Sequence, residues 1–156
     1  MTKPIKSQLH QHLQGTKMNI DQVLETLDQF VEQLPRSLGN FALTSGAALV
    51  VHGVRDNCTD IDIQVDEEVW HSLEWRFGAN MQYVHGFPQF LSFTVGPEGD
   101  DYRVKITNTR FHTEMVDGVH VQTLDSIARA KEVWGRRKDA FDLELIAAHL
   151  EETKEN

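Results

Sequence analysis

Residues 60–65 read Asp-Ile-Asp-Ile-Gln-Val, and polar and apolar side chains alternate through all six positions. Successive side chains of an extended chain point to opposite faces, so this pattern predicts a β-strand with one buried face and one polar face. Asp60 and Asp62 then share the polar face, with their α-carbons roughly 6.5 to 7 Å apart. A carboxylate pair at this spacing is either a site for a hard cation or a hydrated strand face.

The residues before this strand predict a second strand, a turn and a short helix. Phe41–Thr44 is short and apolar, as a buried strand would be, and Ser45-Gly46 follows it directly. Residues 47–51 are apolar again, and we expect about two helical turns that end at Gly53. Backbone amides at the start of such a helix can hold a phosphate, although a Ser-Gly pair by itself is usually only a turn.

The remainder of the chain predicts a mixture of helices and short strands. Apolar residues recur at helical spacing in four segments, which are 19–35, 67–77, 124–133 and 139–150. Asn19 and Thr123 are placed to cap two of these helices. Helical spacing also places Trp75 and Phe141 among the residues expected to pack inward. Short β-rich segments predict a meander-like sheet over 89–95, 102–107, 111–116 and 119–121.

Composition limits the classes of protein that the chain can belong to. Its 156 residues are 40% hydrophobic and 25% charged, which is typical of one folded domain. A net charge of −9 argues against a broad nucleic-acid-binding surface, which would need a basic face. The lone cysteine and the absence of a run of about 20 apolar residues lead us to expect a cytoplasmic protein without a membrane partner. Residues 1–17 are polar and are expected to form a flexible arm.

Two stretches of the chain resemble the nucleotidyltransferase superfamily, in particular the small bacterial and phage-type members that include AbiEii-type toxins. The first stretch contains the Ser45-Gly46 turn, a short helix that ends in His52-Gly53, then Arg55 and Thr59-Asp60-Ile61-Asp62. The second contains Lys131 and the run Arg-Arg-Lys-Asp-Ala-Phe-Asp-Leu at 136–143, which is similar to the Lys…Arg-x-Lys-Asp-x-x-Asp-Leu ending of that superfamily.

The resemblance implies an α/β (α+β) fold, with a mixed β-sheet flanked by helices in one domain over 18–152. It implies that Asp60 and Asp62 are catalytic and bind Mg²⁺ together with a nucleoside triphosphate. Ser45 and Gly46 would hold the phosphates. The implied reaction is transfer of a nucleoside monophosphate to a hydroxyl of an acceptor, which is a small molecule, an RNA end or a protein.

The resemblance also gives roles to residues further along the chain. Arg55 would bind the nucleotide, and Lys138 would be catalytic, near the nucleotide and held by a neighbouring acid. The chain itself supports another interpretation of the second stretch. Asp139 and Asp142 lie in the first turns of the last predicted helix, where the helix dipole favours acidic groups, so these residues can be purely structural.

A third carboxylate, which catalytic members of the superfamily usually supply from a nearby strand, is hard to find. If Val104 faces the core, Lys105 lies where that acid is expected, and its ammonium group would compete with metal for the aspartates. Asp101 and Glu114 are the remaining candidates. The alternative function is therefore a catalytically degenerate fold that acts by binding, as a regulatory or toxin–antitoxin protein. Because the chain is short, we expect a protein partner or a second copy to contribute the acceptor.

Overall fold

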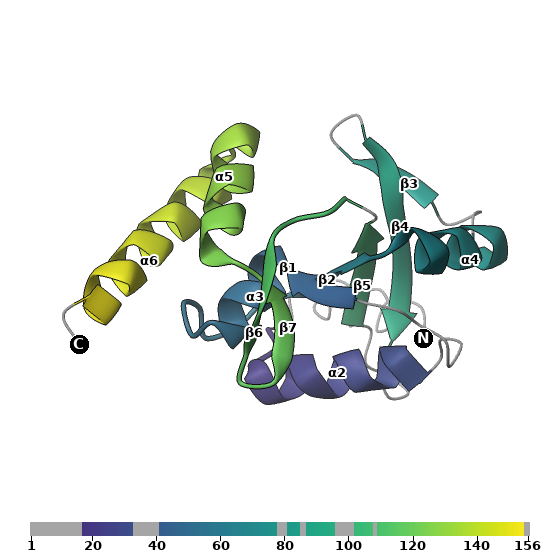
Figure 1. The fold of residues 1–156 in the computed structure, drawn as a ribbon, viewed down its shortest axis with the longest axis horizontal. Coiled ribbons are helices and arrows are strands. Elements are labelled where there is room, and N and C mark those ends of the chain that lie inside the picture. Colours follow the sequence, from purple (N-terminus) through teal and green to yellow (C-terminus); the bar gives the residue numbers. More distant parts are fainter. Residues whose placement is uncertain are drawn as a thin grey trace, which may run out of the picture.

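The computed structural model describes residues 17–32, 41–77, 81–84, 87–95, 102–107 and 109–154. These ranges form a mixed β-sheet flanked by helices (Figure 1), which confirms the predicted α/β (α+β) arrangement. The helices are α2 (Ile20–Glu32), α3 (Ser45–Val51), α4 (Glu67–Phe77), α5 (Leu124–Trp134) and α6 (Arg137–Lys154). None of them is long and apolar enough to cross a membrane. Apart from Lys17, the expected N-terminal arm lies outside the described residues.

The strands are β1 (Phe41–Thr44), β2 (Asp60–Val65), β3 (Met81–Val84), β4 (Phe87–Val95), β5 (Tyr102–Thr107), β6 (Thr113–Val116) and β7 (Val119–Gln122). They lie in the order β3-β4-β5-β2-β1-β7-β6. The predicted meander is confirmed for the antiparallel pairs β4–β5 and β6–β7. The expected continuation from β5 to β6 was wrong, because β5 pairs in parallel with β2 and β7 pairs in parallel with β1. Strand β3 had no counterpart among the predicted segments.

A row of buried apolar side chains crosses the centre of the sheet and determines which face is the core. Leu43 of β1 lies in register with Val121 of β7 and with Ile63 of β2, which is in register with Ile106 of β5. All four side chains are fully buried. Because side chains alternate along each strand, the neighbouring row, which contains Asp62, must lie on the opposite face.

Helices cover the sheet unequally. Residues of α2 and α3 belong to the same apolar core as the central row of the sheet. Figure 1 shows α5 and α6 side by side at one end of the molecule and α4 at the other end.

The two predicted helix caps are confirmed: the Gln22 amide donates to Asn19 Oδ1 at 3.0 Å, and the Ser126 amide donates to Thr123 Oγ1 at 3.2 Å.

Two predicted core residues are instead exposed. Trp75 is 89% exposed and Phe141 is 62% exposed. Each lies five residues from a buried side chain of its own helix, Trp70 in α4 and Ile146 in α6, which is a rotation of about 140° around the helix axis. Among the side chains that the structure describes, the buried ones of each helix lie on one side, and Trp75 and Phe141 are not on it. The expectation that these two residues pack in the core was therefore wrong.

The connection between β1 and α3 contains a strained residue. Helix α3 begins at Ser45, directly after the last residue of β1, so that no loop residue intervenes. Ser45 makes this turn with φ of 53°, in the left-handed region that residues with a side chain rarely adopt.

We therefore predict that Ser45→Gly is about 1 kcal/mol more stable than Ser45→Ala, because only glycine adopts this backbone conformation without a clash at Cβ. Urea unfolding of the two variants measures the difference. Comparing them removes the contribution of the serine hydroxyl, which both lack. Equal stability would mean that the turn is not strained in this way.

Candidate functional site

A pocket of about 750 Å³ opens where β1 ends and β2 begins. Its lining includes all six residues that the sequence assigned to binding or catalysis, which are Ser45, Gly46, Arg55, Asp60, Asp62 and Lys138. They come from the start of α3, the loop before β2, β2 itself and α6. The topology thus brings the two motif stretches into one cavity.

The two aspartates lie on the polar face of β2, as the alternation predicted. Asp62 is in register with Thr44 of β1 on one side and with Lys105 of β5 on the other. Lys105 lines the pocket, and its Nζ lies 3.7 Å from Asp60 Oδ2. The predicted encounter between Lys105 and the aspartates is therefore confirmed. Both side chains are about one third exposed (34% and 35%), so water screens this ion pair.

Asp62 is the more perturbed of the two acids. Burial raises the pKa of its carboxyl from 3.8 to about 6, and the charge of Asp60 adds to the increase, while the charges of Lys105, Lys138 and Lys131 oppose it. An acid that is costly to ionise within a pocket is a common mark of a functional site.

The described residues contain no group of three or more His, Cys, Asp or Glu side chains that could hold a metal ion. Glu114 is exposed on β6, at the edge of the sheet, and is not among the residues lining the pocket. Asp101 lies outside the described residues. The carboxylates of Asp60 and Asp62 nevertheless suit Mg²⁺, which proteins often bind through one or two carboxylates while substrate phosphates and water complete the coordination.

Cys58 also lines the pocket, but it is not suited to be a nucleophile. Burial raises the pKa of its thiol to about 12, even though Arg55 opposes the change. The reactive form of cysteine is the thiolate, which this environment disfavours. Covalent catalysis through Cys58 is therefore disfavoured.

Five charged residues form a cluster along the wall of the pocket, which we call the Lys131 cluster: Arg55, Lys131, Arg136, Asp139 and Asp142. Lys131, Asp139 and Asp142 are buried, and the two arginines are partly exposed. Lys131 is only 3% exposed, and its Nζ lies 2.9 Å from Asp142 Oδ2 and 3.3 Å from Asp139 Oδ1. Arg136 Nε donates to Asp139 Oδ2 at 2.7 Å. Burial alone would raise the pKa of Asp139, but the hydrogen bonds from Arg136 and the charge of Lys131 lower it below its ordinary value.

The Lys131 cluster connects the two motif stretches. Arg55 Nη1 lies 3.6 Å from Asp142 Oδ1, so the loop before β2 is joined to α6. This geometry supports the structural interpretation of Asp139 and Asp142, because both carboxylates neutralise a buried lysine. The ion pairs of Asp139 and Asp142 are with Lys131, Arg55 and Arg136. The expectation was that a neighbouring acid holds Lys138, and these two acids instead hold other cations. Lys138 is exposed at the pocket.

Gln122 was not singled out from the sequence. It is 2% exposed at the end of β7; its Oε1 accepts from the Ser45 amide at 3.0 Å, and its Nε2 donates to Ser126 Oγ at 2.9 Å. Its carbonyl oxygen lies 2.7 Å from His52 Nε2. Gln122 thus fixes the strained turn at Ser45. The only available signal was a glutamine at the end of an apolar segment, which is common in proteins.

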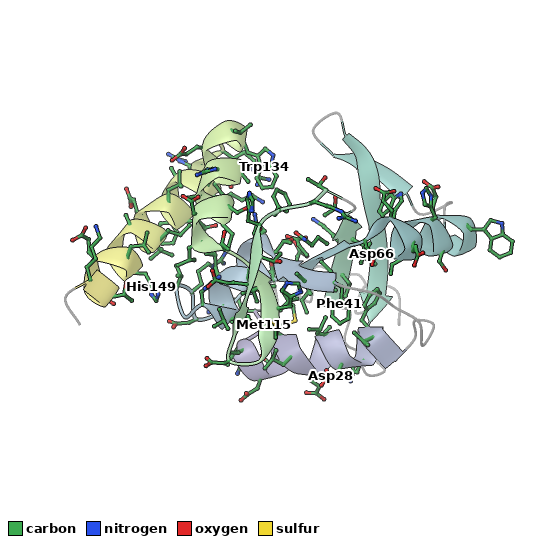
Figure 2. The ribbon with its side chains drawn as sticks, viewed as in Figure 1. Asp28, Phe41, Asp66, Met115, Trp134 and His149 are labelled. Atoms are coloured by element: carbon green, nitrogen blue, oxygen red, sulfur yellow. The ribbon has the colours of Figure 1, made fainter. Side chains whose placement is uncertain are left out.

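Apolar side chains line the part of the pocket formed by α5 and α6. They include Val133, Trp134 and Phe141, and Phe111, from the segment before β6, lines the pocket as well. Figure 2 shows Trp134 at the C-terminal end of α5, and the guanidinium carbon of Arg136 lies 5.0 Å from the centre of its ring. The pocket therefore combines a charged wall from the sheet with an apolar wall from the helices, a combination typical of small-molecule sites.

No family model and no curated protein matches the sequence. Among solved structures, the crystal structure of "a putative nucleotidyltransferase" from Thermotoga maritima is similar, with a TM-score of 0.54 and 20% sequence identity. The likeness covers 86% of this chain and 96% of that one. At this identity the comparison shows the fold alone, and the chain has a nucleotidyltransferase-like α+β fold.

We predict that Lys131→Met lowers the free energy of unfolding by about 3 to 5 kcal/mol, because it leaves Asp139 and Asp142 buried with too little positive charge. Denaturant unfolding measures the change. Lys154→Met is the matched control, since Lys154 pairs with Glu151 on the surface and should cost less than about 1 kcal/mol. A loss below about 1 kcal/mol for Lys131→Met would show that the buried cluster does not stabilise the fold.

We also predict that Asp62→Asn stabilises the protein more at pH 8 than at pH 4.5. The pKa of Asp62 is higher in the folded chain, so ionisation destabilises the fold as pH rises from the ordinary value of 3.8 through about 6. The gain in stability from Asp62→Asn should be smaller at pH 4.5 than at pH 8 by on the order of 1 to 2 kcal/mol. Urea unfolding at both pH values measures it, with Asp117→Asn in the exposed β6–β7 turn as control. An equal gain at both pH values would contradict the burial of Asp62.

Proposed function

We propose that this protein is a magnesium-dependent nucleotidyltransferase that transfers a nucleoside monophosphate from a nucleoside triphosphate to a hydroxyl group. One observation carries the proposal. In a nucleotidyltransferase-like fold, the Asp60–Asp62 pair, the turn at Ser45-Gly46 and the guanidinium of Arg55 line the same pocket. Separately each feature has an ordinary structural explanation, and together they form an environment for a metal-bound triphosphate.

The reaction needs positioning and charge neutralisation more than covalent chemistry. The acceptor oxygen bonds to the α-phosphorus, the bond from that phosphorus to the bridging oxygen breaks, and pyrophosphate leaves with the electron pair. The hydroxyl proton is released to water. Mg²⁺ held by Asp60 and Asp62 would polarise the α-phosphate. The residues of the pocket hold the triphosphate in place and offset its negative charge.

Three of the basic side chains that line the pocket, Arg55, Lys105 and Lys138, are the proposed partners of the phosphates. The Ser45 amide already donates to Gln122, so we assign the closest phosphate approach to Gly46. A Cβ built on Gly46 would meet only Arg55 Nη1 at 3.5 Å and Cys58 Cβ at 3.7 Å, which are ordinary contacts. The packing of the protein therefore does not require glycine at position 46. A ligand that lies close to the backbone would require it.

We leave the acceptor as a hydroxyl of a small molecule, an RNA end or a protein. A cavity of about 750 Å³ falls within the usual range for small-molecule sites, but a triphosphate would occupy much of it. We therefore propose that a protein partner or a second copy of the chain helps to bind the acceptor. The net charge of −9 disfavours contact with a long nucleic acid.

A second candidate function is a catalytically degenerate fold of the AbiEii-like kind that acts by binding, in a regulatory or toxin–antitoxin role. The ion pair between Lys105 and Asp60 favours it, because this ammonium group competes with a metal ion for the same carboxylate. Against it stands the retention of both aspartates, one of them at a cost in stability. A test of binding and a separate test of transfer distinguish the two candidates.

The test measures the melting temperature with each of the four nucleoside triphosphates and Mg²⁺, followed by transfer from α-³²P-labelled triphosphate to an acceptor in a lysate fraction. A triphosphate at about 100 times its Kd should add about 2.7 kcal/mol of stability. Gly46→Ala should fold as stably as wild type and lose most of that gain, because its methyl group fills the phosphate position.

The outcomes separate the proposals. Stabilisation with labelled product supports the transferase, and stabilisation without product in any fraction supports the degenerate binding protein. No stabilisation by any triphosphate with Mg²⁺ would overturn the transferase and leave only a binding role that uses no nucleotide. A Gly46→Ala variant that binds as tightly as wild type would rule out the phosphate position at the turn.

A further inference from the structure

The strands of the sheet contain very few acidic residues. Across the seven described strands only Asp60, Asp62 and Glu114 are acids, and Glu114 lies on the edge strand away from the pocket. In the order of the sheet, β5 and then β4 follow β2 on the side away from β1. Neither β5 (YRVKIT) nor β4 (FPQFLSFTV) contains a carboxylate. A two-metal site is built from several carboxylates that hold two ions about 3.5 to 4 Å apart. These strands supply only one pair.

A third acid on β5, level with Asp62 and on the same face of the sheet, would have to occupy the position of Lys105. Lys105 is the β5 register partner of Asp62, and its Nζ lies 3.7 Å from Asp60 Oδ2. The parallel pairing of β2 with β5 fixes this position, because Ile61 and Ile63 are in register with the buried Val104 and Ile106. A shift by one residue would bury Lys105 and expose the core row, so the lysine is held beside the carboxylates by the packing of the sheet.

We infer that Lys105 replaces the second divalent ion, so that the site binds one divalent cation together with a triphosphate. This inference rests on the proposed function. The ammonium group neutralises Asp60 on the side of β5 and leaves the pair with enough negative charge for one ion. Its fixed place also puts one positive charge near the phosphates without a second metal ion.

Equilibrium dialysis with Mn²⁺ and the α,β-methylene analogue of the best-bound triphosphate counts the ions held by the protein. Wild type should hold one Mn²⁺ per chain. Lys105→Glu adds a third carboxylate beside the pair and should hold two. Lys105→Met should bind Mn²⁺ about tenfold more tightly than wild type without nucleotide, because the competing ammonium is gone. Lys154→Met removes a surface charge and should leave Mn²⁺ affinity within about twofold.

Two Mn²⁺ ions per wild-type chain would overturn the inference and leave the proposed function standing. In that case the Mn²⁺ count of Asp101→Asn shows whether Asp101, the residue before β5 in the sequence, supplies the extra ligand. Unchanged Mn²⁺ affinity in Lys105→Met would also overturn the inference. If wild type holds no Mn²⁺ with any analogue, the inference and the proposed function fail together. The wild-type count does not depend on whether a variant folds.

Discussion

The parallel pairing of β2 with β5 is the constraint on which the site depends. It aligns Ile63 with Ile106 in the core and, one position away, aligns Asp62 with Lys105 on the opposite face. Burial of the apolar row fixes the register, and the register then places two carboxylates and an ammonium group together in the pocket. The geometry of the candidate site is therefore a consequence of core packing and needs no separate device to maintain it.

The Lys131 cluster supplies the other half of the pocket. A buried lysine between two buried carboxylates is costly to take out of water, and it is tolerated because each charge has a partner at close range. Through Arg55 and Asp142 the cluster joins α6 to the loop before β2. Trp134 and Phe141 of the apolar wall line the same pocket as the aspartates. Ile127 of α5 and Ile146 of α6 also anchor the two helices, because both side chains belong to the hydrophobic core.

Much of this arrangement followed from local pattern. The alternation over 60–65 predicted both the strand and the face of its acids, and the motif around Ser45 and Arg55 predicted the pocket wall. The structural role of Asp139 followed from its place in the first turn of a helix. What the sequence did not reveal is non-local: the parallel partners of β2 and β1, the support of Gln122 for the turn, and the exposure of Trp75. Each depends on which elements meet in space, and periodicity within one segment carries no information about that.

The central claim is that the Asp60–Asp62 pair is a divalent metal site for a triphosphate. Crystals grown with Mn²⁺ and a non-hydrolysable triphosphate test it most directly through an anomalous difference map. We predict one peak within coordination distance, about 2.2 Å, of both carboxylates, with the phosphates between that peak and Arg55. A triphosphate bound elsewhere, or no peak at the pair while Lys105 still contacts Asp60, would contradict the account.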